Sequence, residues 1–147
     1  MKIQTKFLGE MTIDPENIIH FPKGIPAFEE ETEFVIIPLA EKSPFIILQS
    51  LNTPTVGFMA GYPYDFKADY EFELEQSIQQ QLEIESPEDV LVYGILTLKE
   101  TLLQSTMNLL APIVINAKTK VGRQIVLVEN DAHPLRYPLQ AKEGSVR

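Results

Sequence analysis

The chain has 147 residues, of which 44% are hydrophobic and 22% charged, and this fits one globular domain with a real core. It contains no cysteine, which excludes disulfides, zinc–thiolate sites, iron–sulfur clusters and cysteine nucleophiles. Its formal net charge of -9 opposes nucleic-acid phosphate and suits a basic protein partner, so we expect no direct binding of RNA or DNA. The same charge would also serve solubility alone.

The N-terminal stretch "MKIQTKFLGEMTID" alternates polar and apolar residues and lacks the continuous apolar core of a signal peptide. No stretch approaches the run of about 18 apolar residues that a membrane span requires. We therefore expect a soluble cytoplasmic protein with no membrane partner, and a monomer on its own.

Short runs rich in β-branched and aromatic residues predict strands along most of the chain, between 11 prolines that divide it into short segments. The predicted strands cover residues 2–8, 17–21, 33–39, 45–51, 55–61, 90–98, 111–117 and 123–128. Many short strands bounded by Pro, Gly, Asn and Asp are typical of an all-β sandwich or barrel.

Residues 69–84 carry the clearest helical pattern. Leu74, Ile78 and Leu82 recur at every fourth position and would share one helical face. The first half of the segment instead alternates aromatic and acidic residues, as a strand would. We interpret it as a strand at its start and a helix from Gln76.

Two shorter segments also favour helical turns. Residues 28–34 could form one or two turns before a strand, and "SPED" (86–89) predicts a turn or a capped helical turn. We assign residues 1–140 to a single β domain and 141–147, which are polar and without periodicity, to a flexible C-terminal tail.

No catalytic motif is present. The two histidines, His20 and His133, lie far apart in the sequence, and there is no nucleophile elbow, HExxH, phosphate-binding loop or GxGxxG. Acidic residues gather in two runs, 29–33 and 65–75, which are typical of solvated faces, although composition alone does not exclude a two-carboxylate hydrolase. We predict no catalytic residue, no cofactor and no metal site.

The segment "FPKGIPAFEE" (21–30) combines backbone-restricting Pro and Gly residues with the apolar side chains Ile25 and Phe28. One interpretation is a pre-ordered binding loop, which loses little entropy on docking. The other is a rigid connector whose Ile and Phe plug one end of a barrel.

The segment "NLLAPIVIN" (108–116) places an asparagine at each end of an apolar run. Because Pro112 cannot donate a ladder hydrogen bond, we expect a strand to begin there. Asn108 and Asn116 are predicted to bond backbone groups where the pairing stops, as structural clamps.

Several stretches together resemble the FliW family of flagellar assembly factors. They are "FPKGIPAFEE" (21–30), "FIILQSLNTPTVGF" (45–58), "VYGILTL" (92–98), "MNLLAPIVIN" (107–116), "GRQIVL" (122–127) and "PLRYPL" (134–139). The resemblance implies an all-β, mainly antiparallel barrel-like fold of short strands with one or two short helices. One departure is Ala27, where the family often has Gly, so we expect slightly different loop geometry.

The resemblance further implies a bacterial cytoplasmic protein that is not an enzyme and that binds two partners in alternation, the translational regulator CsrA and flagellin. Binding of CsrA would relieve its repression of flagellin translation, and accumulating flagellin would displace CsrA until it is secreted. A chaperone of flagellin without a regulatory role stays open, and so does an alternative of another class, a small β-barrel enzyme or flavin-binding split barrel.

We predict two groups of partner-binding residues. For CsrA these are the acidic side chains Asp65, Asp69, Glu71 and Glu73, with the "GIPAF" loop as support. For flagellin, whose terminal helices are amphipathic, they are the apolar side chains Ile25, Phe28, Leu135 and Tyr137. The competing interpretation of every one of these residues is an ordinary structural role.

Overall fold

The computed structural model describes residues 1–41 and 43–139. The predicted tail, residues 141–147, lies outside the described residues. None of the helices within these two ranges is long and apolar enough to cross a membrane.

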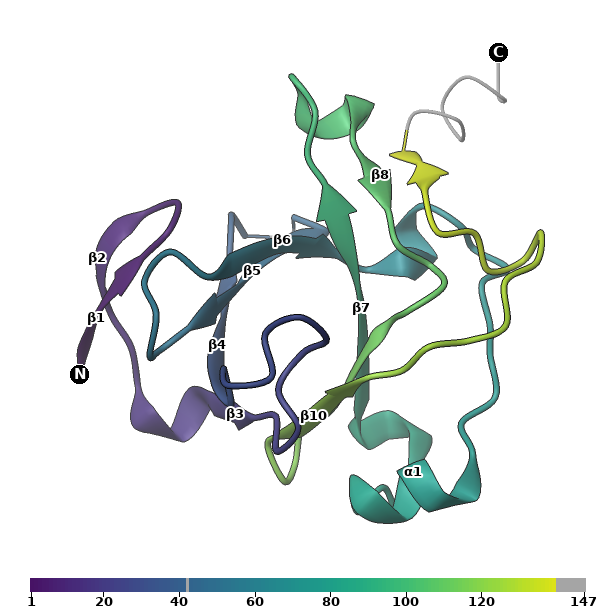
Figure 1. The fold of residues 1–147 in the computed structure, drawn as a ribbon, viewed down its shortest axis with the longest axis horizontal. Helices are drawn as coiled ribbons and strands as arrows, with labels where there is room; N and C mark the ends of the chain where they lie inside the picture. The colour runs from purple at the N-terminus through teal and green to yellow at the C-terminus, as the bar shows by residue number, and fades with distance from the viewer. Residues whose placement is uncertain (42, 140–147) are drawn as a thin grey trace.

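Seven of the described strands close into a barrel, drawn as a ring in Figure 1. In chain order they are β3 (Ile18–His20), β4 (Glu33–Pro38), β5 (Phe45–Ser50), β6 (Gly57–Gly61), β7 (Val90–Thr97), β9 (Ile113–Asn116) and β10 (Val121–Gln124). Around the ring the order is β7, β6, β5, β4, β3, β10 and β9, and β9 pairs with β7 again. All pairings are antiparallel except the short parallel contact of β10 with β3.

The remaining elements decorate the barrel. Strands β1 (Lys2–Thr5) and β2 (Gly9–Thr12) form a separate hairpin, and β8 (Thr106–Met107) and β11 (Tyr137–Pro138) extend the sheet beyond β7. One α-helix, α1 (Gln76–Gln81), and the 3-10 turns η1 (Pro15–Asn17), η2 (Pro63–Asp65), η3 (Pro87–Asp89) and η4 (Leu102–Gln104) are described. The predicted fold class is confirmed.

Two local predictions are confirmed. The helix begins at Gln76, and Ile78 within it and its C-cap residue Leu82 are buried. The "SPED" segment forms η3, in which the Ser86 hydroxyl accepts the backbone N–H of Glu88 at 3.3 Å.

Three local predictions are wrong. Residues 2–8 are not one strand, because Gly9, with φ +69°, and the Thr5 hydroxyl, which accepts the Leu8 N–H at 2.9 Å, turn the chain into a hairpin. Residues 28–34 form turns and then enter β4, since the backbone of Phe28 pairs with that of Ile25. Residues 69–75 form neither strand nor helix, because no strand lies beside them to complete a ladder.

Strand β9 is buried on both faces. Ile113 and Ile115 point into the barrel, where they join a core with Phe21 and Phe34. Val114 points outward and is covered by a second cluster under α1. This explains why the run is so uniformly apolar, because each side of the strand faces other side chains.

Asn116 ends β9 as a buried clamp, as predicted. Its side chain is 1% exposed, and its amide donates to the carbonyls of Leu82 and Glu83 at 2.8 and 3.1 Å. Its oxygen accepts the N–H groups of Lys118 and Thr119 at 2.9 and 3.2 Å. One amide therefore joins the end of the closing strand, the turn that follows it and the end of α1.

Pro112 and Asn108 explain why β10 ends at Gln124 although a strand was predicted to run to residue 128. Ile125 and Leu127 still donate to the carbonyls of Pro112 and Leu110, at 2.9 and 2.8 Å. The return bonds are missing because proline has no N–H and because the Leu110 N–H donates to the Asn108 side chain at 3.0 Å. The prediction that Asn108 bonds the backbone where pairing stops is confirmed.

We predict that Asn116→Ala lowers the free energy of unfolding by about 2–3 kcal/mol, because it leaves buried carbonyl and N–H groups without partners. The matched control is Asn108→Ala, which removes two hydrogen bonds at a half-buried site and should cost about 1 kcal/mol. Urea denaturation of both variants measures the difference, and equal losses would contradict the clamp.

Candidate partner-binding surface

The described residues bring together no group of three or more His, Asp or Glu side chains that could hold a metal ion. His20 lies on β3, with Nδ1 3.9 Å from a carboxylate oxygen of the half-buried Glu33. The hydroxyls of Tyr62 and Tyr93 lie 3.3 Å apart, and burial raises the pKa of Tyr93 well above its ordinary value. Tyr93 therefore keeps its proton at neutral pH and is poorly suited to act as a base.

The acidic segment, residues 65–75, begins at the end of η2, continues through turns to Asp69, and from there alternates outward carboxylates with inward rings. Asp69, Glu71 and Glu73 are exposed, whereas Tyr70 is only 3% exposed. The Tyr70 hydroxyl donates to the carbonyl of Leu109 at 2.8 Å, and burial raises its pKa. The alternation read from the sequence is therefore real, although no ladder is formed.

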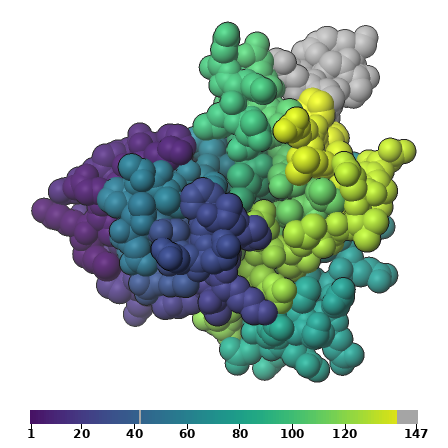
Figure 2. Space-filling model, viewed as in Figure 1, coloured from purple at the N-terminus to yellow at the C-terminus, as the bar shows by residue number. Residues whose placement is uncertain are grey.

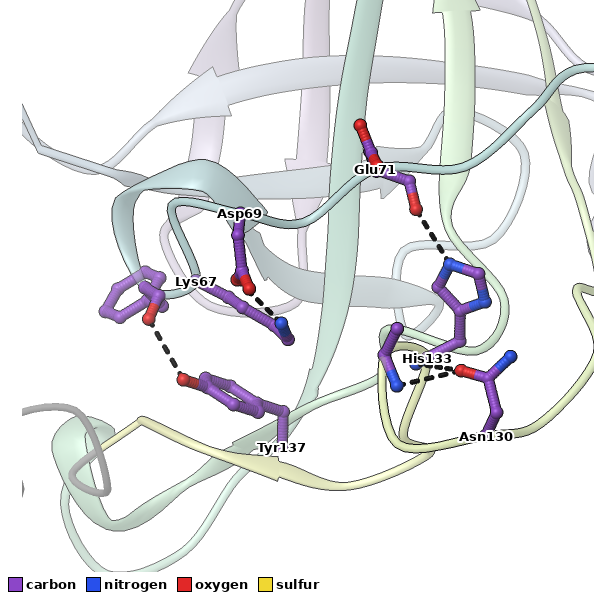
Figure 3. Close-up of polar contacts among 8 residues, drawn as sticks. Lys67, Asp69, Glu71, Asn130, His133 and Tyr137 are labelled. Carbon is purple, nitrogen blue, oxygen red and sulfur yellow. Dashed lines mark hydrogen bonds and ion pairs between the residues drawn. The ribbon is translucent and has the colours of Figure 1, made fainter.

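Side chains from the C-terminal segment, residues 130–138, hold the acidic segment in place (Figure 3). The Tyr137 hydroxyl donates to the carbonyl of Phe66 at 3.2 Å. His133 Nε2 lies 2.8 Å from the carbonyl oxygen of Glu71. Because a carbonyl only accepts, Nε2 carries the proton. Asn130 fixes the position of the histidine in turn, since its side-chain oxygen accepts the backbone N–H of His133 at 3.0 Å.

The acidic segment carries five carboxylates and one ammonium, Lys67, which leaves a formal charge of -4. Lys67 Nζ lies 2.7 Å from Asp69 Oδ1, and this hydrogen bond and its charge lower the pKa of the Asp69 carboxyl below its ordinary value. No ion pair is formed by Glu71, Glu73 or Glu75 within the described chain. The segment is thus a concentrated, largely unneutralised negative surface.

The predicted apolar residues fall into two places. Leu135 is 43% exposed beside the acidic segment's anchors, and the half-buried Tyr137 serves as one of those anchors. Phe28 is 38% exposed, with its ring edge-on to Phe58. Ile25 is 2% exposed and belongs to the barrel core, so its side chain does not reach the surface.

The loop of residues 21–30 crosses the open ring of strands in Figure 1. Ile25 and Phe28 pair across a tight turn, and Pro26 followed by Ala27 with φ +74° is typical of a type II turn. Ala27 thus occupies the left-handed region that glycine prefers. Gly24, with φ +64°, is required, since a Cβ there would lie 2.6 Å from the backbone of Glu29. Ile25 plugs the barrel, while Phe28 stays available.

The sequence analysis did not predict two features of the surface. A cleft of about 650 Å³ is lined by Tyr62, Tyr64, Tyr70 and Phe72. A groove of about 570 Å³ lies along residues 123–128, where Pro26 faces it together with Glu73 and Glu75. The groove had a signal in the sequence, which is Pro112. Because Pro112 has no N–H to donate to Ile125, the ladder between β9 and β10 stops at the residues that line the groove. The cleft has no sequence signal, because its tyrosines converge only in the fold.

Comparisons with known proteins agree along nearly the whole chain. The family described as "FliW protein" matches residues 2–139. The flagellar assembly factor FliW of Geobacillus sp. (strain WCH70) is 46% identical over 131 residues, 89% of this chain and 90% of that protein. The Bacillus subtilis (strain 168) protein of the same name is 43% identical, over 95% of this chain and 96% of its own length.

A solved structure is also similar. It is described as the crystal structure of the flagellar assembly factor FliW and superposes with a TM-score of 0.87 at 40% sequence identity. The match covers 95% of this chain and 96% of that one.

We predict that His133→Ala loosens the acidic segment without unfolding the barrel. Loss of one hydrogen bond of about 1 kcal/mol should raise amide hydrogen exchange in residues 66–73 roughly fivefold. His133→Gln, whose amide can still donate to Glu71, should restore much of the protection. His20→Ala, at an exposed histidine, is the control and should change nothing in this segment. Unchanged exchange in His133→Ala would show that the histidine is no anchor.

Proposed function

The chain belongs to the FliW family, and from that premise we propose that it is a flagellar assembly factor that acts in the bacterial cytoplasm as a regulatory binding protein and not as an enzyme. The resemblance read from the sequence is confirmed by the family match. In this proposal the protein binds CsrA and flagellin in alternation. It relieves the repression of flagellin translation by CsrA and couples translation to flagellin secretion.

The anchored acidic segment is the observation that supports the proposed binding of CsrA. An RNA-binding regulator must present basic surface, and a segment with a formal charge of -4 attracts and orients such a surface. The same field repels RNA phosphate from the complex. Antagonism therefore needs no steric block of the RNA site. The anchors from His133 and Tyr137 keep the carboxylates in a fixed arrangement, so little order is lost on binding.

Exposed apolar side chains support the proposed binding of flagellin. Amphipathic helices dock on apolar surfaces with polar rims, and Phe28 and Leu135 supply exposed apolar area. Tyr137 contributes from its half-buried position next to the acidic segment, and Ile25 contributes only by holding the loop.

Alternation requires that binding of one partner lowers the affinity for the other, and linkage makes the effect reciprocal. The structure offers a short route for such coupling. Tyr137 and His133 lie on the same C-terminal segment as Leu135 and bond the backbone of the acidic segment directly. A helix that moves Leu135 would pull on both anchors.

The alternative of a small β-barrel enzyme or flavin-binding split barrel is not favoured, because the relatives that match along the chain are named flagellar assembly factors.

We predict that the triple charge reversal Asp69→Lys, Glu71→Lys and Glu73→Lys weakens CsrA binding at least tenfold, since each reversal removes an attraction and adds a repulsion. The anchor at Glu71 uses its backbone carbonyl, so the fold should survive. Titration calorimetry measures the affinity, and flagellin binding should change little.

The matched control reverses three other exposed carboxylates, Glu16, Glu41 and Glu100, which lie outside the acidic segment and the loop of residues 21–30, and alters the net charge by the same amount. If the control weakens CsrA binding equally, the attraction comes from the overall charge. If the triple reversal leaves the affinity unchanged, the acidic segment is not the CsrA surface.

A further inference from the structure

The segment that follows β10 presents a strand edge without a neighbour. Ile125 and Leu127 donate inward to the carbonyls of Pro112 and Leu110. In an extended chain the N–H and C=O of alternate residues point to opposite edges, so those of Val126 and Val128 point away from that partner. In the described part of the chain, the backbones of these two valines make no hydrogen bond.

The side chains along this segment alternate between a buried face and an exposed face. Ile125 is buried with Ile78 and Leu82 of the cluster under α1. Val126 and Val128 point to the opposite face, where their exposed fractions of 68% and 79% are the highest among the large exposed hydrophobic residues of the described chain. An edge with free backbone groups and exposed valines is a surface that proteins ordinarily cover or charge.

A groove runs beside this free edge. Pro26 of the plugging loop, Glu73, Glu75 and Ile78 line it together with residues 123–128, and its volume is about 570 Å³. Figure 2 shows the yellow-green residues after β10 crossing the surface between the blue loop and the teal region of α1. The groove thus follows the edge, between the plugging loop and the region of α1.

The charge of the groove is negative. Neither Glu73 nor Glu75 forms an ion pair in the described chain, and the exposed Glu129 follows Val128 directly. The basic side chain in the groove is Arg123, and its guanidinium donates to Gln81 Oε1. A strand laid along this edge would place alternate side chains against the valines and against the carboxylates.

We propose that this edge binds an extended segment of a partner protein in which apolar and basic residues alternate, by addition of a strand to the free edge at Val126 and Val128. The apolar side chains lie on the two valines and Pro26, and the basic ones meet Glu73 and Glu75. This goes beyond the proposed function, because it does not depend on which partner supplies the segment.

The test uses amide hydrogen exchange by NMR on the full chain with a synthetic peptide of about eight residues in which Lys and Val alternate. Exchange of the Val126 and Val128 amides should slow at least tenfold at saturating peptide. A peptide of the same composition with its lysines and valines in two blocks is the control and should give no such protection. Because neither CsrA nor flagellin is present, failure here leaves the proposed function standing.

A pair of variants separates backbone from side chain. Val126→Pro with Val128→Pro removes the two outward N–H groups without touching the bonds of Ile125 and Leu127, and should weaken peptide binding at least tenfold. Val126→Thr with Val128→Thr keeps those groups and should retain amide protection at higher peptide concentration.

Three results would overturn the proposal. The first is equal exchange of the Val126 and Val128 amides with and without the alternating peptide. The second is equal protection by the alternating and the block peptide. The third is protection that rises with protein concentration in the absence of peptide, which would identify a second copy of the chain as the occupant. The first two use the unaltered chain and so do not depend on the variants folding.

Discussion

The pairing of β9 with β7 closes the barrel, and most other features of the molecule depend on it. Closure places β9 between the barrel interior and the cluster under α1, so that both of its faces are buried. Asn116 holds the end of this strand through four hydrogen bonds to backbone groups. Two of these reach residues 82 and 83, so the clamp also fixes where α1 ends.

The same segment decides where pairing stops. Pro112 has no N–H, and the Asn108 side chain takes the N–H of Leu110, so the ladder between β9 and β10 cannot continue. The chain beyond Gln124 therefore makes only half of the ladder hydrogen bonds as it leaves the barrel. It leads into the C-terminal segment, which carries His133 and Tyr137. Those two residues then hold the acidic segment. The residues that end the barrel ladder thus also direct the chain toward the anchors of the surface that we propose for partners.

Sequence patterns predicted much of the fold because its signals are local. Runs of β-branched residues between prolines predict the barrel strands, and the spacing of Ile78 and Leu82 predicts α1. One of the failures has a non-local cause. The acidic segment has strand-like alternation, but whether it becomes a strand depends on a neighbour that the fold does not supply. Ala27 adopts a positive φ against its own preference, because the turn between Ile25 and Phe28 requires it.

The candidate surface was predictable only in part. The acidic side chains are exposed as their pattern indicates, and Phe28 and Leu135 are partly exposed. Ile25 could not be separated from Phe28 by sequence, since both flank the same turn and only packing decides which one enters the core. The role of His133 was also hidden, because its partner is a backbone carbonyl 62 residues earlier in the chain.

The proposed function requires that one chain exchanges two partners. The most direct measurement immobilises the protein, saturates it with CsrA, adds flagellin in steps and records how much CsrA stays bound. We predict that CsrA leaves as flagellin binds and that the reverse titration gives the same coupling, as linkage requires. Retention of both partners together at saturating flagellin would contradict it.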